Sequence, residues 1–225
     1  MTGIIVLCRY NSSRLPGKIL KKINGKPILE YIIERLDGLK KHYPFVICTS
    51  LEKTDEPIIT YCKNNNIDYY RGPLDNVALR FLDCAKKKGF DNAVRINGDN
   101  LFLDTSLILT LIEKIESKQL DFISNVKDRT YPKGMSIEIV NLKFYEKSYP
   151  LFKPEDLEHV MTYFYRGDLD NIEYVYNPKK MNSTVNLAID TQEDFENAQL
   201  ILDYMQENHT TYDYNDIINI YSKIG

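Results

Sequence analysis

The hydrophobic residues of this chain alternate between two spacings. Short apolar runs rich in β-branched side chains are typical of buried strands, and they occur at residues 4–8, 45–49, 67–70, 93–96 and 186–190. Between the runs, apolar residues recur every three or four positions, which predicts helices over residues 28–39, 55–65, 75–88, 104–115, from 191 onward and from 212 onward. Strands that alternate with helices favour an α/β fold, with a mostly parallel sheet covered by helices on both faces.

Polar residues at the predicted helix starts support these boundaries. Asp75 and Asp104 are candidate N-caps, because an Asp side chain accepts a hydrogen bond from a free backbone N–H of the first turn. Thr191 with Asp194 approximates a capping box, and Pro27 suits the first turn of the helix over residues 28–39. These residues predict where four helices begin.

The pattern is looser between residues 125 and 180. An alternating stretch predicts a strand over residues 135–140, with Glu138 on the same face as Ser136, and a helix that carries His159 is expected over residues 154–166. The chain has no internal repeat, low-complexity segment or Pro/Gly-rich linker. We therefore expect a single folding unit over residues 1–225, with an extension at about 127–180.

The composition of the 225-residue chain narrows its class. Hydrophobic residues make up 43% and charged residues 27%, as in ordinary soluble proteins, and the net charge of −3 argues against a nucleic-acid partner. The four cysteines, Cys8, Cys48, Cys62 and Cys84, have no CxxC spacing, which favours buried thiols in a reducing compartment. A signal-peptide pattern and a run of about 18 apolar residues are both missing. A cytoplasmic protein without a membrane segment is the expectation.

Polar and cationic chemistry begins directly after the first predicted strand. Arg9, Arg14 and Lys18 stand among small polar residues, and Pro16 and Gly17 constrain the path of the backbone. Backbone N–H groups, hydroxyls and cations at a strand end suit a phosphate-binding loop. A solvated basic turn is the alternative interpretation.

The motif in this loop, Arg9-x-x-Ser12-x-Arg14-Leu15-Pro16-Gly17-Lys18, closely resembles the signature loop of bacterial cytidylyltransferases. This group includes the CMP-sugar-acid synthetases and the SpsF family of polysaccharide biosynthesis, to which the resemblance is closest. Neither a Walker P-loop nor a GxGxxG dinucleotide motif occurs. The resemblance implies a Rossmann-like nucleotidyltransferase sheet with a small α+β dimerisation extension.

Two aspartates are candidate metal ligands. Asp99 follows a predicted strand and Gly98, where a carboxylate can hold Mg²⁺ against a triphosphate, although a turn or a helix cap uses the same residue type. The segment resembles the strand-Gly-Asp element of the family, whose Asp binds metal. Asp190 matches the second metal ligand in the closing motif of the family, and a helix N-cap is its alternative role.

The resemblance assigns roles to further residues. Arg14 and Lys18 are implied as the catalytic cations, and Asp99 and Asp190 as the ligands of a Mg²⁺ cofactor. The implied nucleotide-binding residues are Arg9, Ser12, Leu15, Gly17, Arg71, Asp75 and Asn97. The implied substrate-binding residues are Tyr131, Gly134, Glu138 and His159. For Glu138 and His159, a solvated carboxylate and a packing imidazole stay open as alternatives.

The activity that the resemblance implies is transfer of CMP from CTP to a hydroxyl of a sugar acid of the 2-keto-3-deoxy type, by a homodimer, with release of pyrophosphate. A phosphorylated alcohol or a phosphonate is an alternative acceptor. A glycosyltransferase would use an Asp-x-Asp metal motif, and Asp168-Leu169-Asp170 has that spacing in a polar loop, where surface acids are the simpler explanation. A non-catalytic nucleotide-binding regulator is the third class considered.

Overall fold

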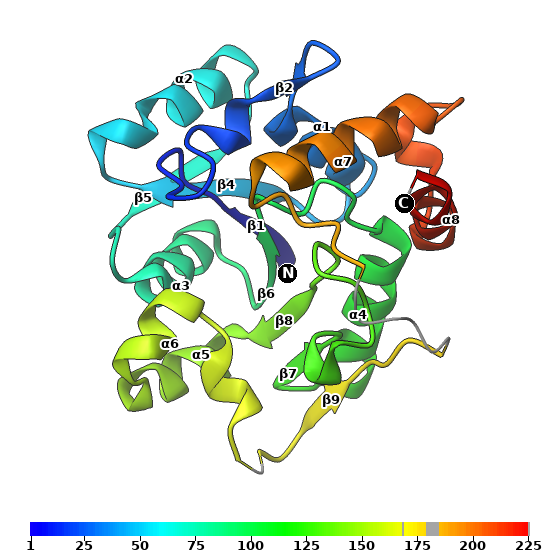
Figure 1. Ribbon diagram of the computed structural model, residues 1–225. Helices are drawn as coiled ribbons and strands as arrows, with labels where there is room; N and C mark the ends of the chain where they lie inside the picture. Colours follow the sequence, from blue (N-terminus) through cyan, green and yellow to red (C-terminus); the bar gives the residue numbers. More distant parts are fainter. Residues whose placement is uncertain (168, 179–184, 225) are drawn as a thin grey trace.

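A central sheet organises the protein (Figure 1). The computed structural model describes residues 1–167, 169–178 and 185–224, and in this part of the chain the sheet has the strand order β5-β4-β1-β6-β8-β7-β9. The strands are β1 (Thr2–Leu7), β4 (Phe45–Ser50), β5 (Tyr69–Gly72), β6 (Asn92–Asn97), β7 (Phe122–Ser124), β8 (Glu138–Asn141) and β9 (Ile172–Tyr174). A small hairpin joins β2 (Lys22–Ile23) to β3 (Lys26–Pro27).

The sheet is mostly parallel, which confirms the predicted α/β class. Strands β5, β4, β1 and β6 run parallel to one another, and β9 runs parallel to β7. Strand β8 is antiparallel to both of its neighbours, β6 and β7. The segment over residues 127–180 therefore contributes β8 to the interior of the sheet and β9 to its edge.

Helices cover both faces. The helices are α1 (Ile28–Asp37), α2 (Glu56–Asn64), α3 (Val77–Lys88), α4 (Thr105–Lys118), α5 (Leu142–Ser148), α6 (Pro154–His159), α7 (Gln192–Tyr204) and α8 (Tyr214–Ile224). Along β1, Ile4 and Val6 pack with α1, α2, α4, α7 and α8, whereas Ile5 and Leu7 pack with α3, α5 and the segment after α6. Successive side chains of a strand point to opposite faces, so one buried strand serves both cores.

Asn125 explains why β8 is shorter than predicted. The strand expected over residues 135–140 begins only at Glu138. Before it, the Asn125 side-chain amide donates to the Met135 carbonyl at 2.8 Å and accepts from the Ile137 N–H at 2.8 Å. A side chain thus replaces a neighbouring strand as the hydrogen-bond partner of this backbone.

The prediction of a strand over residues 186–190 is wrong. The backbone there forms an isolated bridge between Asn186 and Lys133, and the Ile189 N–H donates to the Asp99 carbonyl at 3.1 Å. The segment therefore bonds first to the loop of Lys133 and then to the loop of Asp99. It is buried like a strand, but it does not pair with a neighbouring strand along its length.

The helix predicted over residues 154–166 ends at His159. Val160 has φ 59° and ψ −50°, and the Met161 N–H donates to the His159 carbonyl at 2.6 Å, which makes a γ-turn. This turn is strained for a β-branched residue. A short 3₁₀ helix over Thr162–Tyr165 follows.

Most predicted helix caps are confirmed, with one correction. Asp104 accepts hydrogen bonds from the backbone N–H groups of Ser106 and Leu107, and Thr191 with Asp194 forms a capping box. The cap of α3 is Asn76, which accepts from the Leu79 N–H at 2.8 Å, and not Asp75. Asp75 lies one residue too early for that bond.

The four cysteines are buried and unpaired, as expected. Among the helices of the described residues, none is long and apolar enough to cross a membrane.

Candidate active site

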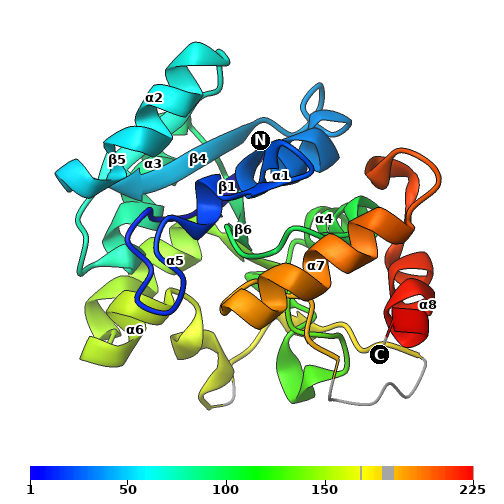
Figure 2. The same ribbon diagram turned by 45° about the horizontal axis from the view of Figure 1, so that its top comes forward.

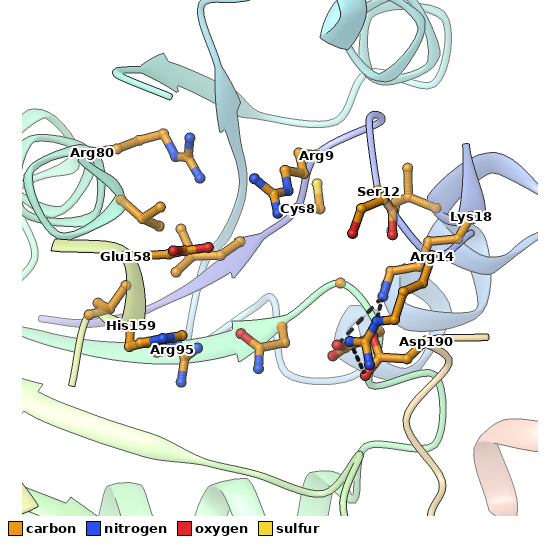
Figure 3. A pocket seen from close by; sticks show the side chains of 18 residues that line it. Cys8, Arg9, Ser12, Arg14, Lys18, Arg80, Arg95, Glu158, His159 and Asp190 are labelled. Carbon is orange, nitrogen blue, oxygen red and sulfur yellow. Dashed lines mark hydrogen bonds and ion pairs between the residues drawn. The ribbon is translucent and has the colours of Figure 1, made fainter. Parts of the chain in front are cut away.

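A cavity of about 280 Å³ opens at the carboxyl ends of β1 and β6 (Figure 3). Ligands of open α/β sheets bind at this edge. We call this cavity the first cavity. The residues that line it are Leu7, Cys8, Arg9, Ser12, Ser13, Arg14, Lys18, Ile19, Val77, Arg80, Arg95, Asn97, Gly98, Asp99, Glu158, His159, Val160 and Asp190.

The loop from Cys8 to Lys18, which we call the signature loop, is closed by two hydrogen bonds to a single carbonyl, that of Tyr10. The Tyr10 carbonyl accepts the Ser12 N–H at 3.0 Å and the Gly17 N–H at 2.9 Å. Gly17 has φ 69°, and a Cβ added there would lie 3.1 Å from the Tyr10 ring, so this turn favours glycine. Figure 2 shows the loop in dark blue beside the start of α7 in orange.

Two cations and two carboxylates meet at one end of the first cavity. Lys18 Nζ lies 2.9 Å from Asp190 Oδ1 and 3.7 Å from Asp99 Oδ2. It also donates to the Ile189 carbonyl at 2.7 Å. Arg14 binds the second oxygen of Asp190 at 2.9 Å, with 64% of its side chain exposed. In this arrangement Asp190 is bound by cations, and Thr191 fills the N-cap position of α7.

The two carboxylates differ electrostatically. Burial and the neighbouring Asp190 raise the pKa of Asp99, and the attraction of Lys18 opposes them. Burial acts in the same direction on the pKa of Asp190, but Lys18 and Arg14 outweigh it, so that pKa is lowered. Asp190 is therefore the more firmly ionised of the pair.

The donor set of this pair suits Mg²⁺. Asp99 Oδ1 is buried and has no hydrogen-bond partner among the described residues. Mg²⁺ is commonly bound by one or two carboxylates together with substrate phosphates. No cluster of three or more metal-ligating side chains occurs in the described part of the chain, so a metal here would need oxygens from a ligand.

Gly98 allows the two strand ends to approach. A Cβ added at Gly98 would lie 2.6 Å from Cys8 Cβ and 3.3 Å from the Leu7 carbonyl oxygen. The Gly98 N–H donates to that carbonyl at 2.9 Å. Any side chain at this position would push Asp99 away from the signature loop.

A second cavity of about 270 Å³ adjoins the first. Its lining residues are Arg95, Asn97, Val126, Arg129, Ser136, Glu138, His159, Thr162 and Tyr165. Arg95, Asn97 and His159 line both cavities, so the two share a wall.

A buried polar network supplies part of the lining of the second cavity. Glu138 is 3% exposed and forms an ion pair with Arg95. The Tyr165 hydroxyl donates to Glu138 at 2.6 Å and lies 2.6 Å from Ser124 Oγ. Burial, together with Glu138, raises the pKa of Tyr165, so its phenol stays protonated at neutral pH. Glu138 is thus neither solvated nor unpaired.

The structure brings together most of the sequence-predicted site residues. Those that line a cavity are Arg9, Ser12, Arg14, Lys18, Asn97, Asp99, Glu138, His159 and Asp190. Leu15, in the signature loop, is buried as part of the core, and Gly17 shapes the loop without lining the cavity.

Besides Leu15 and Gly17, four predicted residues line neither cavity: Arg71, Asp75, Tyr131 and Gly134. Arg71 pairs with Glu56. Tyr131 packs edge-on against Tyr214, with ring centroids 5.6 Å apart. Gly134 (φ 89°) lies against the Leu187 backbone, where an added Cβ would come within 2.5 Å. Asp75 is exposed in the turn before α3.

Three arginines were missed by the sequence analysis. Arg80 and Arg95 line the first cavity, and Arg129 lines the second. Arg95 interrupts the apolar run of β6, and Arg80 lies among the buried residues of α3. A cation at an apolar position of a strand or helix is a signal that could have pointed to both.

These observations define a nucleotidyltransferase of the α/β type. The cytidylyltransferase family model matches residues 3–222, and the chain belongs to that family. It resembles the solved structure of a cytidylyltransferase from Leptospira borgpetersenii serovar Hardjo-bovis, with a TM-score of 0.90 and 29% identity over 99% of this chain and 94% of the other.

Two curated relatives are similar in sequence. The spore coat polysaccharide biosynthesis protein SpsF of Bacillus subtilis is 26% identical over 88% of this chain and 84% of its own length. The 3-deoxy-manno-octulosonate cytidylyltransferase 2 of Hydrogenovibrio crunogenus is 54% identical over 123 residues, which cover 53% of this chain and 49% of that protein. The second match therefore spans about half of each protein.

Proposed function

We propose that this enzyme transfers CMP from CTP to a hydroxyl of a 2-keto-3-deoxy sugar acid and releases pyrophosphate, as a step of surface polysaccharide synthesis. The observation that carries the proposal is the cluster of Lys18, Arg14, Asp99 and Asp190 at the end of the first cavity. The family and the names of the two curated relatives support the nucleotide and the class of acceptor.

The first cavity is proposed to hold CTP. Arg9, Arg14, Lys18 and Arg80 line it, and these cations can bind a triphosphate. In the reaction the acceptor hydroxyl oxygen forms a bond to the α-phosphorus and loses its proton to solvent, while the bond from the α-phosphorus to the pyrophosphate oxygen breaks. Negative charge grows on the leaving pyrophosphate, where Lys18 and Arg14 can stabilise it.

Asp99 and Asp190 are proposed to hold Mg²⁺ together with phosphate oxygens of CTP. Bound there, the ion would supply Lewis-acid stabilisation of the phosphates. Without nucleotide, Lys18 and Arg14 already balance the two carboxylates, so little net charge is left to attract a free cation. We expect the metal to bind mainly as its CTP complex.

The second cavity is proposed to hold the acceptor. Arg95 and Arg129 can bind a carboxylate, while Glu138, Ser136 and the Tyr165 hydroxyl can bind sugar hydroxyls. The same arginines suit a phosphorylated alcohol or a phosphonate, which are the alternative acceptors. The shared wall would bring the acceptor hydroxyl next to the α-phosphate.

A pyrophosphate-release assay tests the proposal. The four ribonucleoside triphosphates would be combined with Mg²⁺ and a panel of 2-keto-3-deoxy sugar acids, phosphorylated alcohols and phosphonates. CTP with a sugar acid should give the fastest release. Faster release with ATP or GTP would overturn the choice of nucleotide, and preference for a phosphorylated alcohol or phosphonate would overturn the acceptor.

The same assay distinguishes the other classes. A glycosyltransferase would consume a sugar nucleotide without pyrophosphate release, and a regulator would bind CTP without turnover. Of the Asp-x-Asp motif, Asp168 lies outside the described residues, and Asp170 is exposed and lines neither cavity.

We also propose that the enzyme is a homodimer with residues 127–180 in the contact. Leu151 (64% exposed) and Tyr176 (48% exposed) are large apolar side chains on this segment. Light scattering at micromolar concentration should give twice the 26.3 kDa mass of one chain. A mass of one chain would contradict the dimer.

A further inference from the structure

The backbone of Tyr10 anchors the signature loop at both of its polar groups. Its carbonyl closes the loop by accepting the Ser12 and Gly17 N–H groups. Its N–H donates to Asp55 Oδ1 at 2.7 Å. Ser12, which donates the first closing bond, and Arg14, which lies between the two bonds, both line the first cavity. The position of this cavity wall therefore depends on what holds Tyr10.

Asp55 is a fixed partner for Tyr10. It is 1% exposed, and its Oδ2 atom accepts from the Thr49 hydroxyl at 2.7 Å, the Ser50 N–H at 2.9 Å and the Ser50 hydroxyl. Burial alone would raise the pKa of Asp55, but the hydrogen bonds from Ser50, Tyr10 and Thr49 outweigh it and lower the pKa. Oδ2 of Asp55 thus binds the end of β4, while Oδ1 binds the Tyr10 N–H of the signature loop.

A role as an ordinary helix cap does not account for these contacts. Asp55 stands at the N-cap position of α2, yet its side chain makes no capping hydrogen bond to that helix. Its oxygens bond instead to the end of β4 and to Tyr10, which is 45 residues away in the chain.

Arg71 binds the backbone of the segment that runs from the end of β4 to Asp55. Its guanidinium donates to the carbonyls of Ser50 and Glu52, each at 3.0 Å, and pairs with Glu56. Arg71 thus braces the segment that carries Asp55, and it lines neither cavity.

We propose that Asp55 is a positioning residue for nucleotide binding, which holds Ser12 and Arg14 over the first cavity by fixing the backbone of Tyr10. This inference rests on the proposed CTP site. Because a displacement of about 1 Å can cost on the order of 10²-fold in rate, a shift of the loop should weaken both binding and turnover.

Asp55→Asn tests the inference sharply. The Tyr10 N–H bonds to one carboxylate oxygen and the Ser50 N–H to the other, and neither backbone donor can turn away. Whichever way an Asn amide is flipped, its NH₂ group faces one of these N–H groups. The conservative substitution therefore breaks one of the two connections.

Asp104→Asn is the matched control. Asp104 is 5% exposed, and its two oxygens likewise accept fixed N–H donors, from Ser106 at 2.8 Å and from Tyr214 at 2.9 Å. It lines neither cavity. The two variants should lose similar stability, so a difference in ligand binding reports positioning and not folding.

Titration calorimetry with CTP and Mg²⁺ would be run well below the melting temperature of each variant. Asp55→Asn should raise the Kd for CTP by about tenfold or more, and Asp104→Asn should stay within about twofold of wild type. If Asp55→Asn does not fold, Asp55→Glu is the second variant, since it keeps the charge but moves the carboxylate, and the same loss of affinity is expected.

Two outcomes would overturn the inference. Equal CTP affinity in the Asp55 and Asp104 variants would reduce Asp55 to a structural residue while leaving the proposed function intact. A wild-type protein that does not bind CTP would refute the proposed function itself, and the positioning role with it.

Discussion

The first and second cavities share a wall but hold their charges in different ways. In the first, Lys18 and Arg14 of the signature loop pair with Asp190, and Lys18 also lies near Asp99 at the end of β6. Arg14 is 64% exposed, whereas Lys18 is 14% exposed. In the second, Glu138 and Arg95 lie on adjacent strands, with side chains only 4% and 17% exposed. Exposed pairs can exchange partners when a polyanion binds, whereas a buried network has a fixed geometry.

This difference suggests a division of roles. The first cavity can release Arg14 to a triphosphate at little cost, because solvent already screens its pair with Asp190. The second cavity presents a preformed set of donors and acceptors, which suits recognition of one acceptor. We expect substitutions in the first cavity to act on rate, and those in the second to act on acceptor binding and stability.

The largest effect is expected for the cations of the first cavity. Lys18→Ala and Arg14→Ala should each lower kcat for pyrophosphate release by about 10²–10³-fold, with smaller changes in KM for CTP. The control is Lys21→Ala, because Lys21 bonds to Gln192 outside the cavity. Normal turnover in either folded cavity variant would reduce the signature loop to a structural turn.

The second-largest effect is expected at Asp190, the carboxylate that pairs with Lys18 and Arg14. Asp190→Asn should lose most activity at low Mg²⁺, by roughly tenfold or more, and recover part of it as Mg²⁺ is raised, because an amide is a poor ligand for a hard cation. Its melting temperature should change by only a few degrees, since Thr191 caps α7. A Mg²⁺ titration that matches wild type would leave Asp99 as the candidate protein ligand.

In the second cavity, Glu138→Gln should act on the acceptor. The substitution leaves the Arg95 charge without its partner, which is expected to cost about 3–5 kcal/mol of unfolding free energy. KM for the acceptor should rise by about tenfold, while the Kd for CTP stays near wild type. Urea unfolding and the two ligand affinities check this, and a change confined to CTP binding would reverse the assignment of the cavities.

The smallest effect is the stability change in Arg14→Ala. Its ion pair with Asp190 is largely exposed, so the free energy of unfolding without ligand should change by about 1 kcal/mol or less. The same urea titration compares it with Glu138→Gln. Losses of equal size in the two variants would show that the Arg14–Asp190 pair contributes as much to stability as the buried Glu138–Arg95 pair, which would remove the contrast between the cavities.

The order of strands and helices could largely be predicted from the sequence up to Asp104. There, each buried strand is one apolar run, each helix has one apolar face, and the signature loop is a contiguous motif. All of these features depend on residues that are close together in the chain. Local spacing therefore determined the α/β class, most helix starts and the chemistry of the loop.

The errors lie where contacts between distant segments decide the backbone. Asn125 takes the hydrogen bonds that would have lengthened β8, and the segment around Ile189 bonds to Asp99 instead of to a strand. Val160 ends its helix in a strained turn that no local signal predicts. For residues 135–137 and for Ile189, a partner outside the segment itself overrode the local pattern.

The sequence by itself determined which chemical groups stand at the ends of β1 and β6, because they follow apolar runs directly. Only the tertiary structure decided that Lys18 lies between Asp99 and Asp190, that Arg80 and Arg95 enter the first cavity, and that Asp55 holds the signature loop. Those contacts join strands, helices and loops that meet only when the sheet is complete. Their distances depend on packing over the whole fold, which residue spacing does not encode.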